Sequence, residues 1–255
     1  MSDEPEVLVT QQDRILVVTI NRPHARNAVN AAVSQRLAQA MDRLDADPQL
    51  SVGVITGAGG TFCAGMDLKA FSRGEVVSVE GRGLGFTESP PMKPLIAAVE
   101  GFALAGGTEL ALAADLIVAS AESVFGIPEV KRGLFAAGGG LLRLPQRIPY
   151  AIAMELALTG DNLTATRAAE LGLVNILAAP GAALDEAISL AQRITANGPL
   201  AVAATKRIIV ESRNWPPEKM FAEQGKLKPS VFNSHDAREG ALAFAEKRPP
   251  QWTGT

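Results

Sequence analysis

The sequence predicts an α/β fold in which parallel strands are joined by helices, with a helical region towards the C-terminal end. In the first half of the chain, short apolar runs lead into glycine turns and then into helix-forming segments. This order is typical of parallel strands with helical crossovers. After about residue 138 the pattern becomes mainly helical. The 255 residues are enough for one large α/β domain, or for a core with a small helical appendage.

The elements of the first half follow from these patterns. Val7–Thr10 and Arg14–Ile20 are β-rich runs that predict a hairpin. Val29–Leu44 is an Ala-rich amphipathic segment that predicts a helix ending at Asp47 and Pro48. Three short apolar runs that lead into turns or loops predict buried strands at Val52–Thr56, Leu95–Val99 and Leu116–Ala119.

The second half of the chain is predicted to be helical. Ala182–Asn197 places its apolar residues on one face and is followed by a Gly-Pro stop. Further helices are expected at Pro199–Glu211, Pro216–Lys226 and Ser234–Ala245. Arg73–Pro91 has no clear period and is rich in Gly, Ser and Glu, so we expect a mobile or variable loop, of the kind that often lines a site.

The composition excludes several classes of protein. A net charge of −3 argues against nucleic acid as the main partner. The single cysteine, Cys63, excludes intramolecular disulfides, and with only His24 and His235 as histidines we expect no metal site. No signal peptide is visible and no stretch of about 18 uninterrupted apolar residues occurs. We therefore expect a cytoplasmic protein with no membrane partner.

The run VGVITGAGG at 52–60 resembles a dinucleotide-binding turn, because a strand leads directly into glycines. The further glycines that would let a pyrophosphate approach the backbone are replaced by Thr61 and Cys63. Short-chain dehydrogenases also need a Tyr and a Lys four residues apart, but Tyr150 is followed at that distance by Met154. The dehydrogenase interpretation therefore fails.

Two glycine turns have the properties of an anion site. The turn at residues 64–67 predicts a helix start at which the N–H of Met66 is free. Gly106 and Gly107 open another helix, where unpaired N–H groups favour negative charge and no Cβ obstructs a ligand oxygen. Each turn alone is explained as well by a structural role. Cys63 has no His nearby in sequence and is predicted to be a small buried filler.

Two glutamates accompany these turns. Glu109 lies in the first turn of the helix that begins at Gly106, and Glu129 follows a proline in a later loop. Taken singly, Glu109 is an ordinary complement to the helix dipole and Glu129 an ordinary solvent-facing acid. Two free amides together with two carboxylates at the ends of neighbouring strand–loop units make a more specific pattern. It indicates acid–base chemistry beside a site for developing negative charge.

At this point the sequence resembles the crotonase (enoyl-CoA hydratase/isomerase) superfamily over nearly its whole length. The stretches that carry the resemblance are NRPHARNAV (21–29), ITGAGGTFCAGMDLK (55–69), KPLIAAVEGFALAGGTELALAADLIVAS (93–120), FGIPEVKRGL (125–134) and AFAEKRPPQW (243–252). The last of these is most similar to the enoyl-CoA hydratase and carnitinyl-CoA dehydratase branch.

The resemblance implies a spiral of ββα turns over residues 1–195 that holds a coenzyme A thioester site. It also implies a C-terminal helical region over 196–255 that builds homotrimers, often stacked as hexamers. The oxyanion hole falls at the N–H groups of Met66 and Gly106, and the catalytic carboxylates at Glu109 and Glu129. The resemblance places substrate contacts at Arg22, Ala25, Arg26, Ala64, Met66, Asp67, Leu68, Lys69, Gly107 and Phe135. No cofactor is expected apart from coenzyme A, which is part of the substrate.

The chain departs from the family pattern in two places. His24 stands where many hydratases have Lys, so the coenzyme phosphates are expected to depend on Arg22, Arg26 or Lys69. The segment 135–137 replaces a usual Pro and Gly beside the acyl pocket, and we expect Met66 and Phe135 to narrow that pocket.

The expected activity is reversible syn hydration of a 2-trans-enoyl-CoA, because both hydratase carboxylates are present. The alternatives are a carnitinyl-CoA dehydratase-like reaction, an isomerase that uses one glutamate, and a non-catalytic acyl-CoA-binding protein. A serine hydrolase is disfavoured because the sequence has no G-x-S-x-G elbow.

Overall fold

A six-stranded sheet with the strand order β1-β2-β3-β4-β6-β9 forms the base of the computed structural model, which describes residues 4–255. β1 and β2 form an antiparallel hairpin, and every other neighbouring pair is parallel. The strands are β1 Val7–Gln12, β2 Ile15–Ile20, β3 Val52–Gly57, β4 Leu95–Val99, β6 Leu116–Ser120 and β9 Ile176–Ala178. The predicted hairpin and the three predicted buried strands are confirmed.

Three further strands form a second, smaller sheet. It contains β5 Phe102–Leu104, β7 Val124–Gly126 and β8 Asn162–Thr164, in the order β5-β7-β8. β4 continues into β5 and then into a helix, and β6 continues into β7 and then into a helical turn. An isolated bridge from Cys63 to Ala103 extends the same arrangement to the turn after β3. This confirms the predicted spiral of ββα turns.

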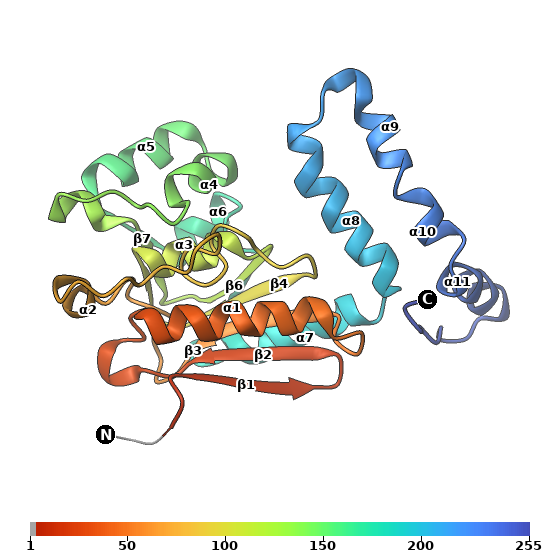
Figure 1. The fold of residues 1–255 in the computed structure, drawn as a ribbon, viewed down its shortest axis with the longest axis horizontal. Helices are drawn as coiled ribbons and strands as arrows, with labels where there is room; N and C mark the ends of the chain where they lie inside the picture. The colour runs from red at the N-terminus through yellow and green to blue at the C-terminus, as the bar shows by residue number, and fades with distance from the viewer. Residues whose placement is uncertain (1–3) are drawn as a thin grey trace.

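Helices cover both faces of the main sheet (Figure 1). α1 (Ala31–Ala46) packs on one face with Leu16 and Val18, while α7 (Ala183–Thr195) packs small alanines against Ile15 and Val17 on the other. The predicted start of α1 at Val29 is wrong by two residues. Val29 pairs with the turn at Met66, and the side chain of Asn30 caps the helix by accepting from the N–H of Val33.

The helices after the strands surround the end of the smaller sheet. They are α2 Leu68–Ser72, α3 Gly106–Ala113, the 3₁₀ helix η2 Pro128–Arg132, α4 Gly140–Arg147, α5 Tyr150–Thr159 and α6 Ala165–Glu170. The segment 73–91 contains no helix or regular strand, and it is anchored to the body by the buried ring of Phe86 and an ion pair from Arg82 to Asp42. None of the helices in residues 4–255 has the length and apolar character needed to cross a membrane.

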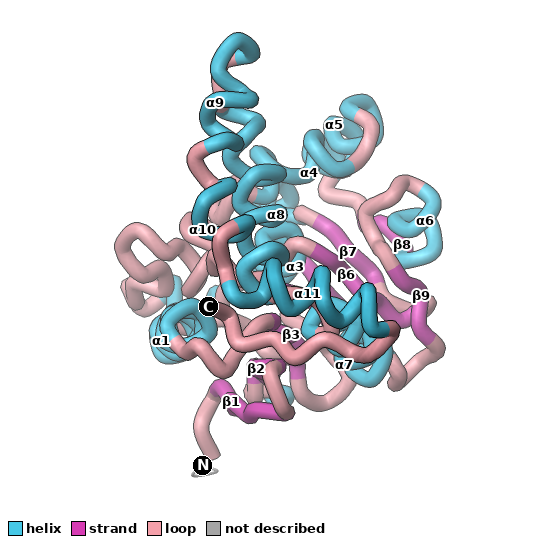
Figure 2. Tube along the Cα trace, turned by 90° about the vertical axis from the view of Figure 1, so that its right-hand side faces the viewer, coloured by secondary structure: helices cyan, strands magenta, loops and turns pink. Residues whose placement is uncertain are grey.

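The C-terminal helices project from the body as an arm (Figures 1 and 2). The arm contains α8 Pro199–Glu211, α9 Met220–Gly225, α10 Lys228–Phe232 and α11 His235–Glu246. α8 has its predicted bounds. The predicted helix Pro216–Lys226 is divided into the 3₁₀ turn η4 Pro217–Lys219 and α9. Whether residues 1–195 and 196–255 behave as separate units stays a prediction.

One lysine joins the arm to the body. Lys206 of α8 is largely buried, and its Nζ lies 2.6 Å from Asp115, 2.7 Å from the Pro91 carbonyl and 2.9 Å from the Lys93 carbonyl. All three hydrogens of the ammonium are therefore satisfied by the body. Asp115 also accepts from the N–H of Leu95, so the same carboxylate ties α8 to the start of β4.

We expect Lys206→Met to lower the free energy of unfolding by about 1–3 kcal/mol, because it removes a charged donor and leaves a partly buried carboxylate without its cation. Arg207→Met is the matched control, since Arg207 makes only an exposed pair with Glu211 on the same helix, worth about 0.5 kcal/mol or less. Urea unfolding of both variants measures the difference. Equal losses would show that the lysine does not anchor the arm.

Candidate active site

Met66 lies where the chain turns from the smaller sheet into α2. The N–H of Val29 donates to the Gly65 carbonyl at 2.8 Å, and the N–H of Asp67 donates to the Val29 carbonyl at 2.8 Å. In a parallel bridge of this kind the central residue turns its own N–H away from the partner strand. Accordingly, the N–H of Met66 donates to no protein acceptor within residues 4–255.

Gly106 supplies a second free amide. It is the first residue of α3, where N–H groups have no intrahelical acceptor, and no other acceptor in the described chain takes its hydrogen. The preceding residue, Ala105, has φ 53° and ψ −126°, a strained conformation held by a 2.8 Å bond from its N–H to the Gly126 carbonyl. A Cβ on Gly106 would lie 3.5 Å from the Met66 nitrogen, so the two free amides lie on facing segments.

Glu109 is buried one turn into α3, with 3% of its surface exposed. One carboxylate oxygen accepts from the N–H of Gly140 at 2.9 Å. Burial raises the pKa of Glu109, while the amides of Gly140 and Gly138 and the guanidinium of Arg143 oppose that rise. Glu109 is thus a desolvated carboxylate that retains partners for its charged form.

Glu129 is also raised in pKa by burial but has fewer partners than Glu109. It lies in the first turn of η2, half-buried, and its Oε2 has no hydrogen-bond partner in residues 4–255. Burial raises the pKa of Glu129 to about 7, and the nearby charge of Glu109 adds to the rise while Arg132 opposes it. Two carboxyl groups that differ in this way are suited to separate acid and base roles, because Glu109 keeps donors for its charged form and Glu129 has fewer.

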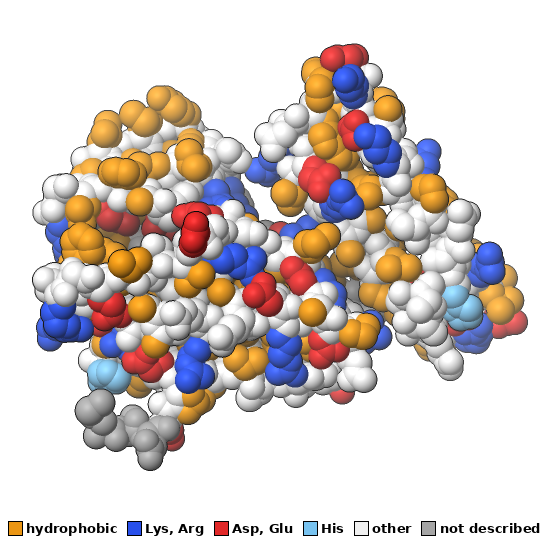
Figure 3. All heavy atoms as spheres, in the orientation of Figure 1, with side chains coloured by type: hydrophobic (Ala, Val, Ile, Leu, Met, Phe, Trp, Pro, Cys, Tyr) orange, Lys and Arg blue, Asp and Glu red, His pale blue; other side chains and the backbone are white. Residues whose placement is uncertain are grey.

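An apolar cavity of about 340 Å³ opens beside Glu129. Apart from this carboxyl group and the Tyr150 hydroxyl, its lining is apolar: Ile127, Val130, Phe135, Ala136, Leu141, Leu144, Pro145, Ala153, Met154, Ala157 and Leu158. Phe135 lines the cavity from the segment that departs from the family pattern, whereas Met66 does not line it. Figure 3 shows apolar side chains gathered over this corner of the molecule, around α4 and α5.

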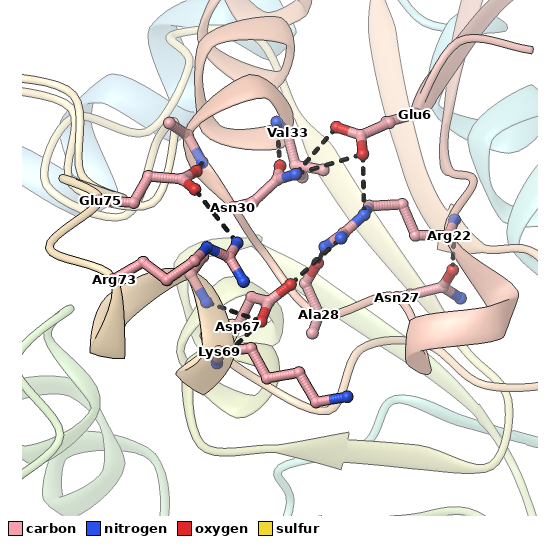
Figure 4. A network of polar contacts seen from close by, with 12 residues as sticks. Glu6, Arg22, Asn27, Ala28, Asn30, Val33, Asp67, Lys69, Arg73 and Glu75 are labelled. Atoms are coloured by element: carbon pink, nitrogen blue, oxygen red, sulfur yellow. Dashed lines mark hydrogen bonds and ion pairs between the residues drawn. The ribbon is translucent and has the colours of Figure 1, made fainter. Parts of the chain in front are cut away.

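Two of the predicted substrate contacts are occupied by the protein itself (Figure 4). The guanidinium of Arg22 is largely buried and pairs with Glu6 at 3.0 Å and Asp67 at 3.1 Å. Asp67 also caps α2 by accepting from the N–H groups of Lys69 and Ala70. Burial alone would raise the pKa of Asp67, but the amide of Ala70 and the Arg22 guanidinium more than offset this and hold it below its ordinary value.

Arg22 and Asp67 therefore hold the 64–67 turn against the 22–30 segment, and any phosphate contact by Arg22 competes with these partners. Arg26 and Lys69 are exposed, and their side chains have no partner in residues 4–255. They are the better placed of the predicted phosphate contacts. Of the remaining predicted contacts, Leu68 is exposed on α2, and Ala25 and Ala64 are half-buried near the same turn.

Gly107 has a packing role, since a Cβ on it would lie 2.0 Å from the Cys63 carbonyl oxygen. Cys63 is fully buried, and burial raises the pKa of its thiol to about 12, so the predicted filler role fits the structure.

The sequence interpretation missed the three consecutive glycines at 138–140. A Cβ on Gly138 would lie 2.7 Å from Glu109 Oε2, and one on Gly140 would lie 3.1 Å from Glu109 Cγ. Only glycine leaves room for the carboxylate at these positions. The triplet was itself a signal of close backbone approach. No group of three or more His, Cys, Asp or Glu suited to a metal ion occurs in the described part of the chain.

Comparison with known proteins agrees with the fold. Residues 10–255 match the family model described as enoyl-CoA hydratase/isomerase. The chain is 44% identical to enoyl-CoA hydratase EchA19 of Mycobacterium tuberculosis, covering 97% of this chain and 96% of that protein. It is 43% identical to carnitinyl-CoA dehydratase of Escherichia coli K12, covering 96% of this chain and 97% of that protein.

Solved structures agree as well. The crystal structure of enoyl-CoA hydratase EchA1 from Mycobacterium marinum is 76% identical and superposes with a TM-score of 0.98, covering 99% of this chain and 100% of that one. The chain belongs to the enoyl-CoA hydratase/isomerase family.

We expect Gly65→Ala to disable the pair of amides. Gly65 has φ +101°, and a Cβ on it would lie 2.7 Å from Ala105 Cβ and 3.2 Å from the Gly106 nitrogen. Gly60→Ala is the matched control, because Gly60 also has positive φ (+74°) but open space around it. Backbone strain should cost each variant roughly 1–2 kcal/mol of stability, and Gly65→Ala should lose more because its Cβ also clashes with Ala105.

Only Gly65→Ala should also lose turnover of a 2-enoyl-CoA, on the order of 10²-fold, the effect of misplacing one oxyanion donor. Unfolding curves and steady-state rates for the two variants separate the effects. A Gly65→Ala enzyme as active as Gly60→Ala would contradict the assignment of the amides.

Proposed function

We propose that the protein catalyses the reversible syn hydration of a 2-trans-enoyl-CoA to a 3-hydroxyacyl-CoA. The observation that carries this proposal is the pair of free amides at Met66 and Gly106 together with two carboxyl groups that differ in their hydrogen-bond partners. Two hydrogen-bond donors suit the thioester oxygen, and two carboxyl groups suit the two proton transfers of hydration. The relatives named enoyl-CoA hydratase and carnitinyl-CoA dehydratase support a reaction of this type.

The proposed chemistry assigns each group one task. Glu109, as carboxylate, orients a water and takes its proton while the oxygen bonds to Cβ. The electron pair moves to the thioester oxygen, where the N–H groups of Met66 and Gly106 stabilise the enolate. Glu129 then gives its proton to Cα. Removing one oxyanion donor typically costs about 3–4 kcal/mol, so each amide contributes as much as one proton-transfer group.

Dehydration reverses these roles. Glu129 takes the proton from Cα, and Glu109 protonates the leaving hydroxyl. In both directions the reactive enzyme carries one proton on the pair of glutamates, and only its position changes. No metal, flavin or nicotinamide takes part in this scheme, and coenzyme A enters only as part of the substrate.

The partner copies and location are also proposals. A homotrimer or hexamer is supported by the apolar side chains that the arm leaves uncovered, among them Phe221 at 87%, Phe232 at 73% and Phe244 at 86% exposure. The cytoplasmic location stays a prediction from the sequence.

We expect Glu109→Gln and Glu129→Gln each to lower hydration of crotonyl-CoA by roughly 10²–10⁴-fold, because each removes one proton-transfer group. Binding of a saturated acyl-CoA, followed by calorimetry, should persist in both variants. Glu122→Gln changes an exposed glutamate between β6 and β7 and serves as the control.

Rival activities give different patterns. An isomerase would lose activity in Glu129→Gln and keep it in Glu109→Gln. Tight acyl-CoA binding by the wild-type chain with no turnover at any acyl chain length would indicate a non-catalytic binding protein. Faster turnover of carnitinyl-CoA than of simple 2-enoyl-CoA substrates would indicate the carnitinyl-CoA dehydratase-like reaction.

The pH dependence follows from the shared proton. As pH rises through about 7, Glu129 loses its proton, so kcat/KM for hydration should fall. At low pH it should fall again as Glu109 becomes protonated, at a pH above the ordinary range for Glu because burial raises its pKa. Since the equilibrium constant fixes the ratio of forward and reverse kcat/KM, dehydration should show the same bell. A hydration profile that is flat from pH 6 to about 9 would rule out the proton-sharing pair.

A further inference from the structure

Arg143 of α4 is a half-buried cation to which the proposed reaction gives no role. Its Nη2 donates to the Thr87 carbonyl at 2.6 Å, and its Nη1 lies 3.4 Å from the Gly138 carbonyl. A Cβ on Gly139 would lie 2.2 Å from Nη1, so the guanidinium rests against the backbone of that glycine. The side chain therefore joins the glycine triplet to the 73–91 segment, 56 residues away along the chain.

Thr87 connects Arg143 to the free amide of Gly106. Thr87 is fully buried, and its hydroxyl accepts from the N–H of Leu84 at 3.0 Å. The Leu84 side chain in turn packs over Gly106, where a Cβ would lie 2.6 Å from Leu84 Cδ1. By holding the Thr87 carbonyl, the Arg143 guanidinium thus also helps to fix Leu84, whose side chain covers Gly106.

Gly138 connects Arg143 to Glu109. The amides of Gly138 and Gly140 face its carboxylate, and Arg143 is the cation whose charge acts on it. Glu129 is also close enough for the charge of Glu109 to raise its pKa, and its own charge is of the same sign as that of Glu109. Arg147, one turn further along α4, donates to the Ala114 carbonyl instead, and β4 and β5 carry no titratable side chain.

We propose that Arg143 is a positioning residue for the proposed hydration, holding Glu109 and its glycine cradle in place through its charge and its two-pronged hydrogen bonding. The inference rests on the proposed function, because it assigns Arg143 a task through the base of that reaction. A planar fork bonded to two carbonyls fixes orientation in a way that a single ammonium does not.

The test compares Arg143→Gln and Arg143→Lys with wild type in kcat/KM for crotonyl-CoA hydration across pH. Arg147→Gln is the matched control, since it removes a half-buried, carbonyl-bonded guanidinium from the same helix, and Arg147 does not act on Glu109. We expect Arg143→Gln to move the acid limb of the profile to higher pH, because Glu109 loses its cation. The loss of kcat/KM should be on the order of tenfold at the optimum, smaller than the roughly 10²–10⁴-fold effect of removing the base itself.

Arg143→Lys should keep the acid limb near its wild-type position and still lower kcat, because the charge remains and the fork is lost. Arg147→Gln should leave the acid limb of the pH profile unmoved, whatever it does to stability.

An acid limb at the wild-type pH in folded Arg143→Gln would overturn the proposal. Where Arg143→Gln does not fold, Arg143→Lys decides alone, and full wild-type turnover in that variant overturns the positioning role. Absence of hydration by the wild-type chain would instead reject the proposed function and is distinguished from both results.

Discussion

The site depends on the backbone contact between the turn at 63–66 and the start of α3. Gly107 packs on the Cys63 carbonyl with no room for a Cβ, and Gly65 lies against Ala105 and the Gly106 nitrogen. Ala105 keeps a strained conformation because the Gly126 carbonyl takes its N–H. These contacts leave two amides without protein acceptors, and the rest of the spiral keeps the two turns facing each other.

The second constraint is electrostatic. Glu109 is more deeply buried than Glu129, yet it has amide donors and a cation for its charged form, whereas Glu129 has a buried oxygen without a partner. Burial alone would push both carboxyl groups towards the neutral form. The difference in partners separates them, and the lining of the cavity beside Glu129, which is apolar apart from the Tyr150 hydroxyl, offers that carboxyl group few polar partners.

The sequence predicted the elements whose signals are local. The strand Leu95–Val99 and the helix Pro199–Glu211 have their predicted bounds, because apolar runs and proline stops act within a few residues. Contacts made across long separations were not predicted. The Gly140 N–H reaches Glu109 over 31 residues and Arg22 reaches Asp67 over 45, and both depend on how the turns of the spiral stack. The residue pattern indicated the paired glutamates and the resemblance implied their roles, but neither predicted the ion pairs of Arg22 with Glu6 and Asp67.

The most direct test of the account is the carbonyl stretch of a bound thioester, measured by isotope-edited infrared spectroscopy with a ¹³C-labelled 2-enoyl-CoA on the Glu129→Gln variant. Two amide donors aimed at one oxygen should polarise the carbonyl and move its stretch to lower frequency than in solution. A bound thioester whose carbonyl absorbs at its solution frequency would contradict the assignment of Met66 and Gly106.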